Sequence, residues 1–580
     1  MEIHRIWVSE GKPHSGHAHT ERLRIRALYK CAIKEAQRAP KQQSWNKLHS
    51  ALTESDTQKF WNSWRSLYSS NKSQFPPVVN GCSSKQDIAN KFKRVFHANS
   101  MPNNPDQVAI INARFHEAYD EYARSHSLAC DCCNHTISVQ LVFDAIQGMK
   151  DGKCAGADGI SAEHLKNAPI LLFHRLSFLL NGMLRHSFVP DQFKKGFMLP
   201  LVKDPQGNLS DASNYRGITI SPVISKVLEH VLKDLFSEFL QTSTLQFGFK
   251  KKSSTIHALY CLKQTVAYYI EHKSNVYCSF LDASKAFDRL VHAGLFLKMI
   301  ERRIPMAFLN IIMYWHDGLS CQVKWDDHFS DWFQITAGVR QGGVLSPDFY
   351  CLYIDDLIGK LQSLGVGCYI RNIFAAALFY ADDMAVLSPS LKGLQKLLDV
   401  CSEYCIQWDI KLNAKKTKNI VFGSKNFPTH CVTLDGNEIP WEQKCKYLGV
   451  TLVSGSSFSC CTTETTRRFY RALNSILRIE GRSDDMVMLR LLEAHCIPIL
   501  TYGVETIHVK DVNERRQMRV AYNAVYRKMF GYSYRESVTL LQHSLGRSTW
   551  EELVEKKKSD FQRRICSCPS DSLVRAFHVS

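Results

Sequence analysis

The segment FYADDMAVLS, residues 379–388, places two adjacent carboxylates, Asp382 and Asp383, inside an apolar run that begins at Ile373. Apolar residues on both sides indicate buried strands, and aspartate tolerates the dihedral angles of a tight turn. The segment therefore predicts a strand, a tight turn and a second strand, with both carboxylates at the turn. An ordinary hairpin with an acidic tip would give the same pattern, so a functional site requires a further partner elsewhere in the chain.

A third carboxylate closes another strand-like run. In the segment SFLDASKAFD, residues 279–288, the apolar stretch ends on Asp282. Three carboxylates gathered at one point repel one another and are costly unless cations neutralise them. Hard divalent cations take oxygen ligands, and two of them can activate a 3′-hydroxyl and stabilise a leaving pyrophosphate. The three aspartates together indicate phosphoryl-transfer chemistry more specifically than the acidic pair does alone.

The composition is that of a basic globular protein with several subdomains. The 580 residues are 45% hydrophobic and 22% charged, and the net charge is +18. Basic residues recur along the chain, which favours a polyanion as partner, although solvated surface lysines would give a similar balance. The start shows no signal-peptide pattern, and no apolar run reaches about 20 residues, so we expect an intracellular protein without a membrane span. Residues 130–135, CDCCNH, lack the second ligand pair of a structural zinc site.

Hydrophobic periodicity predicts helices interleaved with strands, which gives an α+β or α/β core. Helices are predicted over residues 20–70, after Ser84, over 221–241, over 390–408, and again after about 456. Strand-like runs are predicted over 275–282, 320–325, 419–423 and 446–453, beside the acidic hairpin itself.

Taken in order along the chain, eight motifs resemble those of the non-LTR retrotransposon (LINE-type) reverse transcriptases. They are GKCAGADGISAEHLK (152–166), LPLVKDPQGNLSDASNYRGITISPVISKVLEHVL (199–232), QFGFKKKSSTIHAL (246–259), FLDASKAFD (280–288), AGVRQGGVLSPDFYCLYIDDL (337–357), FYADD (379–383), LNAKKTK (412–418) and CKYLGV (445–450). The resemblance runs from about residue 145 to 455. It implies an RNA-directed DNA polymerase with an α+β right-hand fold, in which fingers lie above an antiparallel palm sheet and a helical thumb clamps the hybrid.

The resemblance also implies a division of the chain into four parts. These are a basic helical N-terminal extension (1–140), the fingers (141–275), the palm with the catalytic carboxylates (276–455), and a helical thumb with the C-terminal segment (456–580). No endonuclease-like series of acids and histidines and no clear zinc knuckle is found. The chain therefore resembles the polymerase portion alone, as a fragment of a longer element or as a host-retained copy.

Carried over by motif, the resemblance implies the metal ligands and the nucleotide contacts. Asp282, Asp382 and Asp383 would hold two Mg²⁺ ions, with Mn²⁺ as an alternative, and the main-chain carbonyl of Ala283 would be a further ligand. The residues expected to face the incoming dNTP are Lys203, Arg216, Phe287, Gln341 and Gly342. Among these, Phe287 would clash with a ribose 2′-hydroxyl, although a plain core aromatic would fit the same sequence.

The last two motifs imply a general acid and a primer contact. Lys416 would protonate the leaving pyrophosphate, with Lys415 and Lys418 as competing candidates. The residues that match the primer grip are Tyr447, Leu448 and Gly449. A second acidic pair, Asp355 and Asp356, falls on the helix predicted after RQGG, so we interpret it as structural.

The resemblance implies an RNA template, a DNA primer or target DNA, and dNTPs as partners, with an endonuclease activity supplied in trans. Access to chromosomal DNA would require the nucleus, and ribonucleoprotein assembly the cytoplasm. Two alternatives stay open: a catalytically silent RNA-binding relic, and a maturase-like RNA-binding protein. The intact Asp282, Asp382, Asp383, Arg216 and Gln341 favour a working enzyme.

Overall fold

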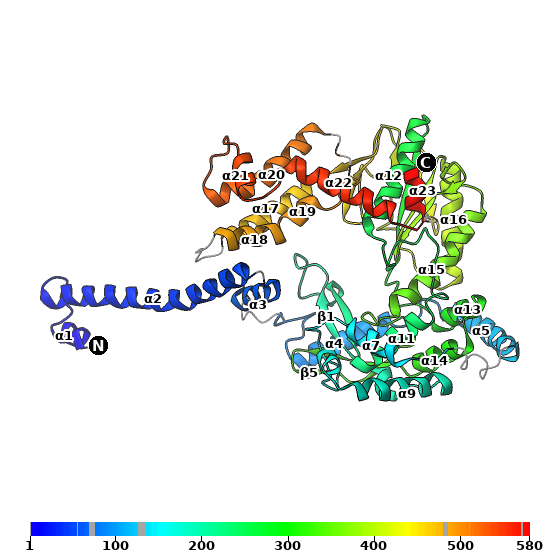
Figure 1. The fold of residues 1–580 in the computed structure, drawn as a ribbon, viewed down its shortest axis with the longest axis horizontal. Helices are drawn as coiled ribbons and strands as arrows, with labels where there is room; N and C mark the ends of the chain where they lie inside the picture. Colours follow the sequence, from blue (N-terminus) through cyan, green and yellow to red (C-terminus); the bar gives the residue numbers. More distant parts are fainter. Residues whose placement is uncertain are drawn as a thin grey trace. The chain divides into compact units, whose positions relative to one another are not determined.

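The computed structural model describes residues 2–54, 56–68, 76–125, 135–478, 485–507, 509, 511–569 and 572–579. The cysteine cluster at Cys130–Cys133 lies outside these residues. The chain divides into two compact units, whose elements are labelled in Figure 1. The smaller unit comprises Met1–Ser73, Cys461–Glu505 and Val509–Ser559, and the larger unit comprises Gln74–Cys460, Thr506–His508 and Asp560–Ser580.

The larger unit contains a four-stranded sheet that carries the three aspartates. Its strand order is β11-β3-β10-β9, and all neighbours are antiparallel. The strands are β3 (Val276–Asp282), β9 (Ala377–Tyr380), β10 (Asp383–Ser388) and β11 (Lys418–Phe422). Helices such as α12 (Thr255–Glu271) and α16 (Leu391–Gln407) pack against the sheet and bury its strands. The strands are therefore almost continuously apolar, as in Met384–Leu387 of β10.

A second sheet of five strands has the order β2-β1-β4-β5, with β6 paired to β4. The strands are β1 (Lys195–Val202), β2 (Tyr215–Ile220), β4 (Ser320–Trp325), β5 (His328–Phe329) and β6 (Phe333–Gln334). Helix α4 (Lys85–Asn99) packs on it through Phe92, whose ring centroid lies 5.0 Å from those of Tyr215 and Trp325. The helix predicted after Ser84 and the strand predicted over 320–325 are both confirmed.

Further helices of the larger unit surround the two sheets. They are α5 (Pro105–Ser125), α7 (Val139–Gln147), α8 (Ala162–Lys166), α9 (Ile170–His186), α10 (Asp191–Lys194), the 3-10 turn η1 (Ala212–Asn214), α11 (Val223–Leu235), α13 (His292–Glu301), α14 (Met306–His316), α15 (Ser346–Ser363) and α23 (Leu573–Val579). Helix α11 ends six residues before the end that its apolar stripe predicted at residue 241. Phe236 leaves helical geometry there and stacks on Phe308 at 4.5 Å, so that its apolar character serves a tertiary contact instead.

The segment 446–453, predicted as one strand, is a hairpin. Strands β14 (Lys444–Tyr447) and β15 (Val450–Val453) pair around a two-residue turn at Leu448 and Gly449, whose φ angles are 43° and 81°. Positive φ at both central residues matches the right-handed twist of the flanking strands. The remaining short strands are β7 (Tyr369–Ile370), β8 (Ile373–Phe374), β12 (Val432–Leu434), β13 (Asn437–Ile439) and β16 (Ser459–Cys461).

The smaller unit is helical, as predicted for both ends of the chain. Its helices are α1 (Glu2–Ser9), α2 (His17–Thr53), α3 (Thr57–Tyr68), α17 (Thr463–Leu477), α18 (Asp485–His495), α19 (Ile497–Thr501), α20 (Val512–Phe530), α21 (Thr539–Ser544) and most of α22 (Trp550–Cys566). Helix α2 runs as one long helix (Figure 1). Across the described residues of both units, no helix is long and apolar enough to span a bilayer.

Candidate active site

The three aspartates converge because two strands of the four-stranded sheet end at the same level. Strand β3 ends on Asp282 and β10 begins on Asp383, and these two residues are register partners in the antiparallel ladder. Asp382 lies in the tight turn that joins β9 to β10. Directly opposite residues of an antiparallel pair project to the same face. The hairpin predicted for residues 379–388 is therefore confirmed.

The turn that carries Asp382 is held by a buried glutamine. Ala381, just before Asp382, adopts a φ of 56°, an unusual angle for a residue other than glycine. The side-chain oxygen of Gln246 accepts the main-chain N–H groups of Ala381 and Gly248, each at 2.9 Å. A Cβ on Gly248 would lie 2.6 Å from the Ala381 nitrogen, so only glycine allows this close approach. The sequence motif QFGF contained this support, but its sequence alone did not reveal the role.

Burial, reinforced by neighbouring carboxylates, raises the pKa values of Asp382 and Asp383. Partial desolvation, followed by the charges of Asp382 and Asp282, raises the pKa of Asp383 to about 6. Desolvation also raises the pKa of Asp382, an effect that its own main-chain N–H and the charges of Arg216 and Lys416 partly offset. Among the residues that the structure describes, no group of three or more His, Cys, Asp or Glu is arranged so that it could hold a metal ion. The three carboxylates are therefore a concentrated negative charge rather than a complete ligand shell.

Lys416 is the lysine of its motif that contacts the cluster. Its ammonium lies 3.5 Å from an Asp282 oxygen, and its side chain is 68% exposed. Lys418, a competing candidate, instead donates to Glu442 at 2.5 Å. Ala283 continues from β3 and forms an isolated antiparallel bridge with Leu412.

Two basic side chains reach the site from the five-stranded sheet. Arg216 lies on β2 opposite Leu201 of β1, and Lys203 follows the end of β1. The ammonium of Lys203 donates to the Ser213 carbonyl at 2.9 Å. Burial lowers the pKa of Lys203, and the neighbouring charge of Arg216 lowers it further. The two residues thus supply positive charge near the aspartates.

Phe287 is wedged between two aromatic rings. It stacks on Tyr350 at a centroid distance of 4.7 Å and meets the edge of Phe249 at 6.0 Å. The next residue, Asp288, accepts a hydrogen bond of 2.5 Å from the Gln341 amide, and burial raises the pKa of the Asp288 carboxyl. Asp288, which the sequence did not single out, therefore ties the Phe287 segment to the RQGG loop.

The RQGG loop, residues 340–343, lies against β2. The Gln341 carbonyl accepts the Thr219 N–H at 2.7 Å, and Gly342 has a φ of 119°. A Cβ on Gly342 would lie 2.6 Å from the Thr219 oxygen, so the glycine is required both for the angle and for the approach. Gln341 and Gly342 are thus held between strand β2, through Thr219, and the segment after β3, through Asp288.

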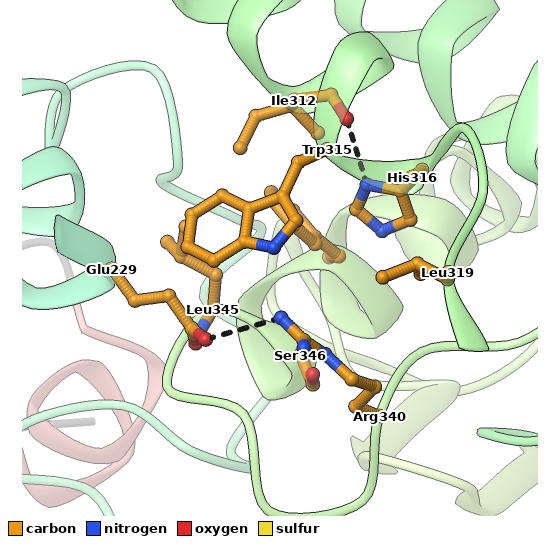
Figure 2. Close-up of a pocket in the computed structure, with 9 residues that line it drawn as sticks. Glu229, Ile312, Trp315, His316, Leu319, Arg340, Leu345 and Ser346 are labelled. Atoms are coloured by element: carbon orange, nitrogen blue, oxygen red, sulfur yellow. Dashed lines mark hydrogen bonds and ion pairs between the residues drawn. The ribbon is translucent and has the colours of Figure 1, made fainter. Parts of the chain in front are cut away.

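A buried ion pair supports the same loop from behind, as Figure 2 shows. A Glu229 oxygen of α11 lies 3.7 Å from the Arg340 guanidinium. The other Glu229 oxygen accepts the N–H groups of Val344 and, at 3.0 Å, Leu345, which precede α15. Arg340 also donates to the Phe193 carbonyl at 2.9 Å. Glu229 therefore anchors both the RQGG loop and the start of the following helix.

The cavity next to this pair is small, about 20 Å³, which is room for about one water molecule. Its wall includes His316, whose ring N–H donates to the Ile312 carbonyl at 2.8 Å (Figure 2), and whose pKa burial lowers to about 3. The neighbouring His292 bonds the Gly338 carbonyl at 2.7 Å. A packed cavity of this size supports the loop and is not a ligand pocket.

The residues matched to the primer grip lie on the β14–β15 hairpin. Tyr447 is buried, with its ring 4.6 Å from that of Phe280 and its hydroxyl donating to the Leu378 carbonyl at 3.2 Å. Leu448 and Gly449 form the turn itself. The tyrosine thus fastens the hairpin to the four-stranded sheet.

The second acidic pair is engaged in ion pairs on α15. Asp355 lies 2.6 Å from Arg302, and Asp356 lies 2.5 Å from the buried Lys298. Asp355 also accepts the Ser243 N–H at 2.8 Å. The helical placement predicted for this pair is confirmed.

Residues 202–452 match the family model described as Reverse transcriptase (RNA-dependent DNA polymerase). The matched segment contains β2, the RQGG loop and the aspartate hairpin, so this part of the chain is similar to a reverse transcriptase domain. This match agrees with the predicted resemblance to reverse transcriptases, and the mixed helices and sheets agree with the predicted α+β class.

Curated relatives extend the similarity beyond this segment. A probable RNA-directed DNA polymerase from transposon BS of Drosophila melanogaster is 27% identical over 74% of this chain and 48% of its own length. An RNA-directed DNA polymerase from mobile element jockey of Drosophila funebris is 25% identical over 77% of this chain and 49% of its own. The chain thus resembles retrotransposon polymerases, and it spans about half the length of these relatives.

Solved structures give a weaker likeness. Apo telomerase from Candida tropicalis aligns with a TM-score of 0.35 at 13% identity, covering 70% of this chain and 74% of that chain. A score this low supports no further conclusion.

Proposed function

We propose that this chain is an RNA-directed DNA polymerase that extends a DNA 3′ end on an RNA template, as in target-primed retrotransposition. The observation that carries the proposal is the register pairing of Asp282 with Asp383, beside Asp382, within a reverse transcriptase domain. Phosphoryl transfer depends mainly on positioning and on charge stabilisation, so concentrated carboxylates serve it better than a nucleophile would.

The donor set fits hard divalent cations, Mg²⁺ or Mn²⁺. Carboxylate oxygens are the ligands such ions prefer, and a cation would relieve the repulsion from Asp382 and Asp282 that adds to burial in raising the pKa of Asp383. Asp282, Asp382 and Asp383 would hold two ions, with the carbonyl of Ala283 as a further ligand. When bound, such ions supply Lewis acidity for a 3′-hydroxyl and for a leaving pyrophosphate.

The surrounding residues would bind the incoming nucleotide. Lys203 and Arg216 would contact the triphosphate, one as a point charge and the other as a planar fork. Gln341 and Gly342 would border the nucleotide and template through the loop fixed against Thr219. Phe287 would lie under the sugar and disfavour a 2′-hydroxyl.

Two further roles concern the proton and the primer. Lys416, beside Asp282, would deliver a proton to the leaving pyrophosphate. The turn at Leu448 and Gly449, fastened through Tyr447, would position the primer 3′ end. The four-part division at residues 140, 275 and 455 remains part of this proposal. We also propose that the partners are an RNA template, a DNA primer and dNTPs, and that another protein supplies the nick. The chain would act in the nucleus after assembly in the cytoplasm.

Primer extension tests the proposal. The purified chain is given an RNA template, a DNA primer, dNTPs and Mg²⁺, beside the double variant Asp382→Asn/Asp383→Asn. The matched control is Asp399→Asn, which removes one exposed carboxylate from α16 behind the sheet. We expect extension by the native chain and the control and none by the double variant. No extension by the native chain, with hybrid binding retained, would overturn the proposal and leave an RNA-binding protein.

A further inference from the structure

One face of α20 in the smaller unit is strongly basic. Arg516, Arg519, Arg527 and Lys528 recur at helical spacing along it. The opposite face is the one that packs into the unit, and its buried residues are Met518, Ala521, Tyr522, Val525 and Tyr526. The helix is therefore fixed by its apolar side and presents its cations outward.

The basic face forms one wall of a groove of about 850 Å³. The other walls come from the loop after α20, from α21 and from the start of α22, all within the same unit. Five basic side chains line the groove and only two acidic ones, Glu536 and Glu551. The ion pair that offsets part of this charge, Arg519 with Glu551 at 3.6 Å, is exposed and therefore weak.

Hydrogen bonds to α20 hold the loop that closes the groove. Gly531, with a φ of 71°, ends α20, and the Tyr532 N–H returns to the Arg527 carbonyl at 3.0 Å. The Arg527 guanidinium then donates twice to the Glu536 carbonyl, at 3.1 and 2.9 Å. Arg527 thus uses two of its N–H groups to hold the loop against the helix.

This loop carries aromatic rings that the fold leaves open to solvent. Tyr534 is 76% exposed and Tyr532 is 41% exposed, although both line the groove. Arg535 donates to the Tyr534 hydroxyl at 2.8 Å, which orients the ring from its polar end. A purely solvated basic face would not require two exposed rings in a concave site beside the cations.

We propose that this groove binds single-stranded RNA. Phosphates would follow Arg516, Arg519 and Lys528, and unpaired bases would stack on Tyr534 and Tyr532. A duplex is disfavoured because its base faces are already stacked inside the helix. Asn523, Ser537 and Thr539, which also line the groove, offer hydrogen-bond partners to a 2′-hydroxyl and favour RNA over DNA. The source of the RNA, an unpaired part of the template, rests on the proposed function.

Binding of a fluorescein-labelled oligouridylate to the whole chain tests the groove. Excess unlabelled RNA–DNA hybrid is present throughout to occupy the polymerase site. Tyr534→Ala should weaken binding about tenfold, whereas Tyr534→Phe, which keeps the ring, should bind like the native chain. Arg516→Ala should lower the slope of log affinity against log salt by about 1. Arg515→Ala removes the same charge from α20 but outside the groove, and it should leave the slope unchanged.

Two further arms commit the proposal to unpaired RNA. Oligodeoxythymidylate and an RNA duplex of the same length should bind more weakly than oligouridylate. Equal binding of the DNA strand or of the duplex would overturn the assignment. So would an identical effect of Arg515→Ala and Arg516→Ala, or native affinity in Tyr534→Ala.

Primer extension separates this inference from the proposed polymerase. If the native chain extends primers while Tyr534→Ala binds oligouridylate normally, the groove assignment fails and the polymerase stands. If oligouridylate binding requires Tyr534 but no primer is extended, the polymerase fails and the RNA groove stands.

Discussion

The carboxylate of Glu229 lies 3.7 Å from the guanidinium of Arg340, and both side chains are almost fully buried. A charge removed from a buried pair leaves its partner without compensation, which costs about 3–5 kcal/mol. This pair also holds the RQGG loop and the N–H groups of Val344 and Leu345, just before α15. Its loss should therefore lower nucleotide binding as well as stability.

We therefore expect Glu229→Ala to lower the free energy of unfolding by about 3–5 kcal/mol. Glu229→Gln keeps an acceptor for Leu345 but loses the charge, so it should unfold less readily than the alanine variant while still raising the KM for dNTP. Thermal denaturation and steady-state primer extension measure the two effects.

A second ion pair between the same helices serves as the control. Lys233 of α11 lies 2.6 Å from Asp348 of α15, with the lysine side chain 29% exposed. Lys233→Ala should cost less stability than Glu229→Ala, because this pair is more exposed, and it should leave the KM for dNTP unchanged. An equal rise in KM for both variants would contradict a specific role of Glu229 in holding the loop.

Gln246 should govern the position of the catalytic turn. Replacing it with methionine keeps the volume but leaves the Ala381 and Gly248 N–H groups without their acceptor, at about 1–3 kcal/mol for each buried group. We expect a fall in the extension rate with hybrid affinity retained, because the residues that move are the turn and its carboxylates. Gln264→Met, on α12, loses a hydrogen bond to Tyr260 and is the matched control, which should extend normally. Lost hybrid affinity in Gln246→Met would point to global damage instead.

The sequence predicted the parts of the site that lie within single motifs. The aspartate hairpin, Asp282 at a strand end, and the helical placement of Asp355 and Asp356 followed from local pattern and motif order. Contacts between distant segments were not predictable, because neither Gln246 with Ala381 nor Glu229 with Arg340 has a local signature.

Two local features were also misjudged, and both have a physical reason. The pair Leu448–Gly449 breaks a strand-like apolar run without a strong turn signal, so a hairpin was taken for one strand. The apolar residues after Leu235 continue the helical stripe in sequence, but Phe236 stacks on Phe308 instead. Tertiary packing decided these positions.

The pKa of Asp383, raised to about 6, predicts a proton that competes with metal. At subsaturating Mg²⁺ the extension rate should rise with pH through about 6, and higher Mg²⁺ should move this midpoint to lower pH. The double variant that combines Asp383→Glu with Asp282→Asn lacks one of the three carboxylates, so it should be inactive at every pH. A midpoint that is independent of Mg²⁺ would show that a different group titrates.

The raised pKa of Asp383 also predicts how the free energy of unfolding depends on pH. Because the folded pKa of Asp383 lies above the ordinary value of 3.8, the folded protein binds more protons than the unfolded chain between pH 3.8 and about 6. Without divalent cations, the contribution of Asp383 to stability should therefore fall as pH rises through this window. Denaturation of Asp383→Asn, which cannot titrate, should show a smaller fall than the native chain, and Mg²⁺ should remove the difference.

Phe287 should determine the choice between dNTP and rNTP. Its ring is fixed by Tyr350 on one side and by Phe249 on the other, so truncation opens space at the sugar while the two neighbours remain. Phe287→Ala should raise the kcat/KM for rNTP relative to dNTP about tenfold or more, since a steric clash of 1.4 kcal/mol corresponds to a factor of about ten. Phe249→Ala, which removes the outer ring and leaves Phe287 on Tyr350, should keep the native preference. An unchanged ratio in Phe287→Ala, with extension of dNTP intact, would make Phe287 a core aromatic that supports Tyr350.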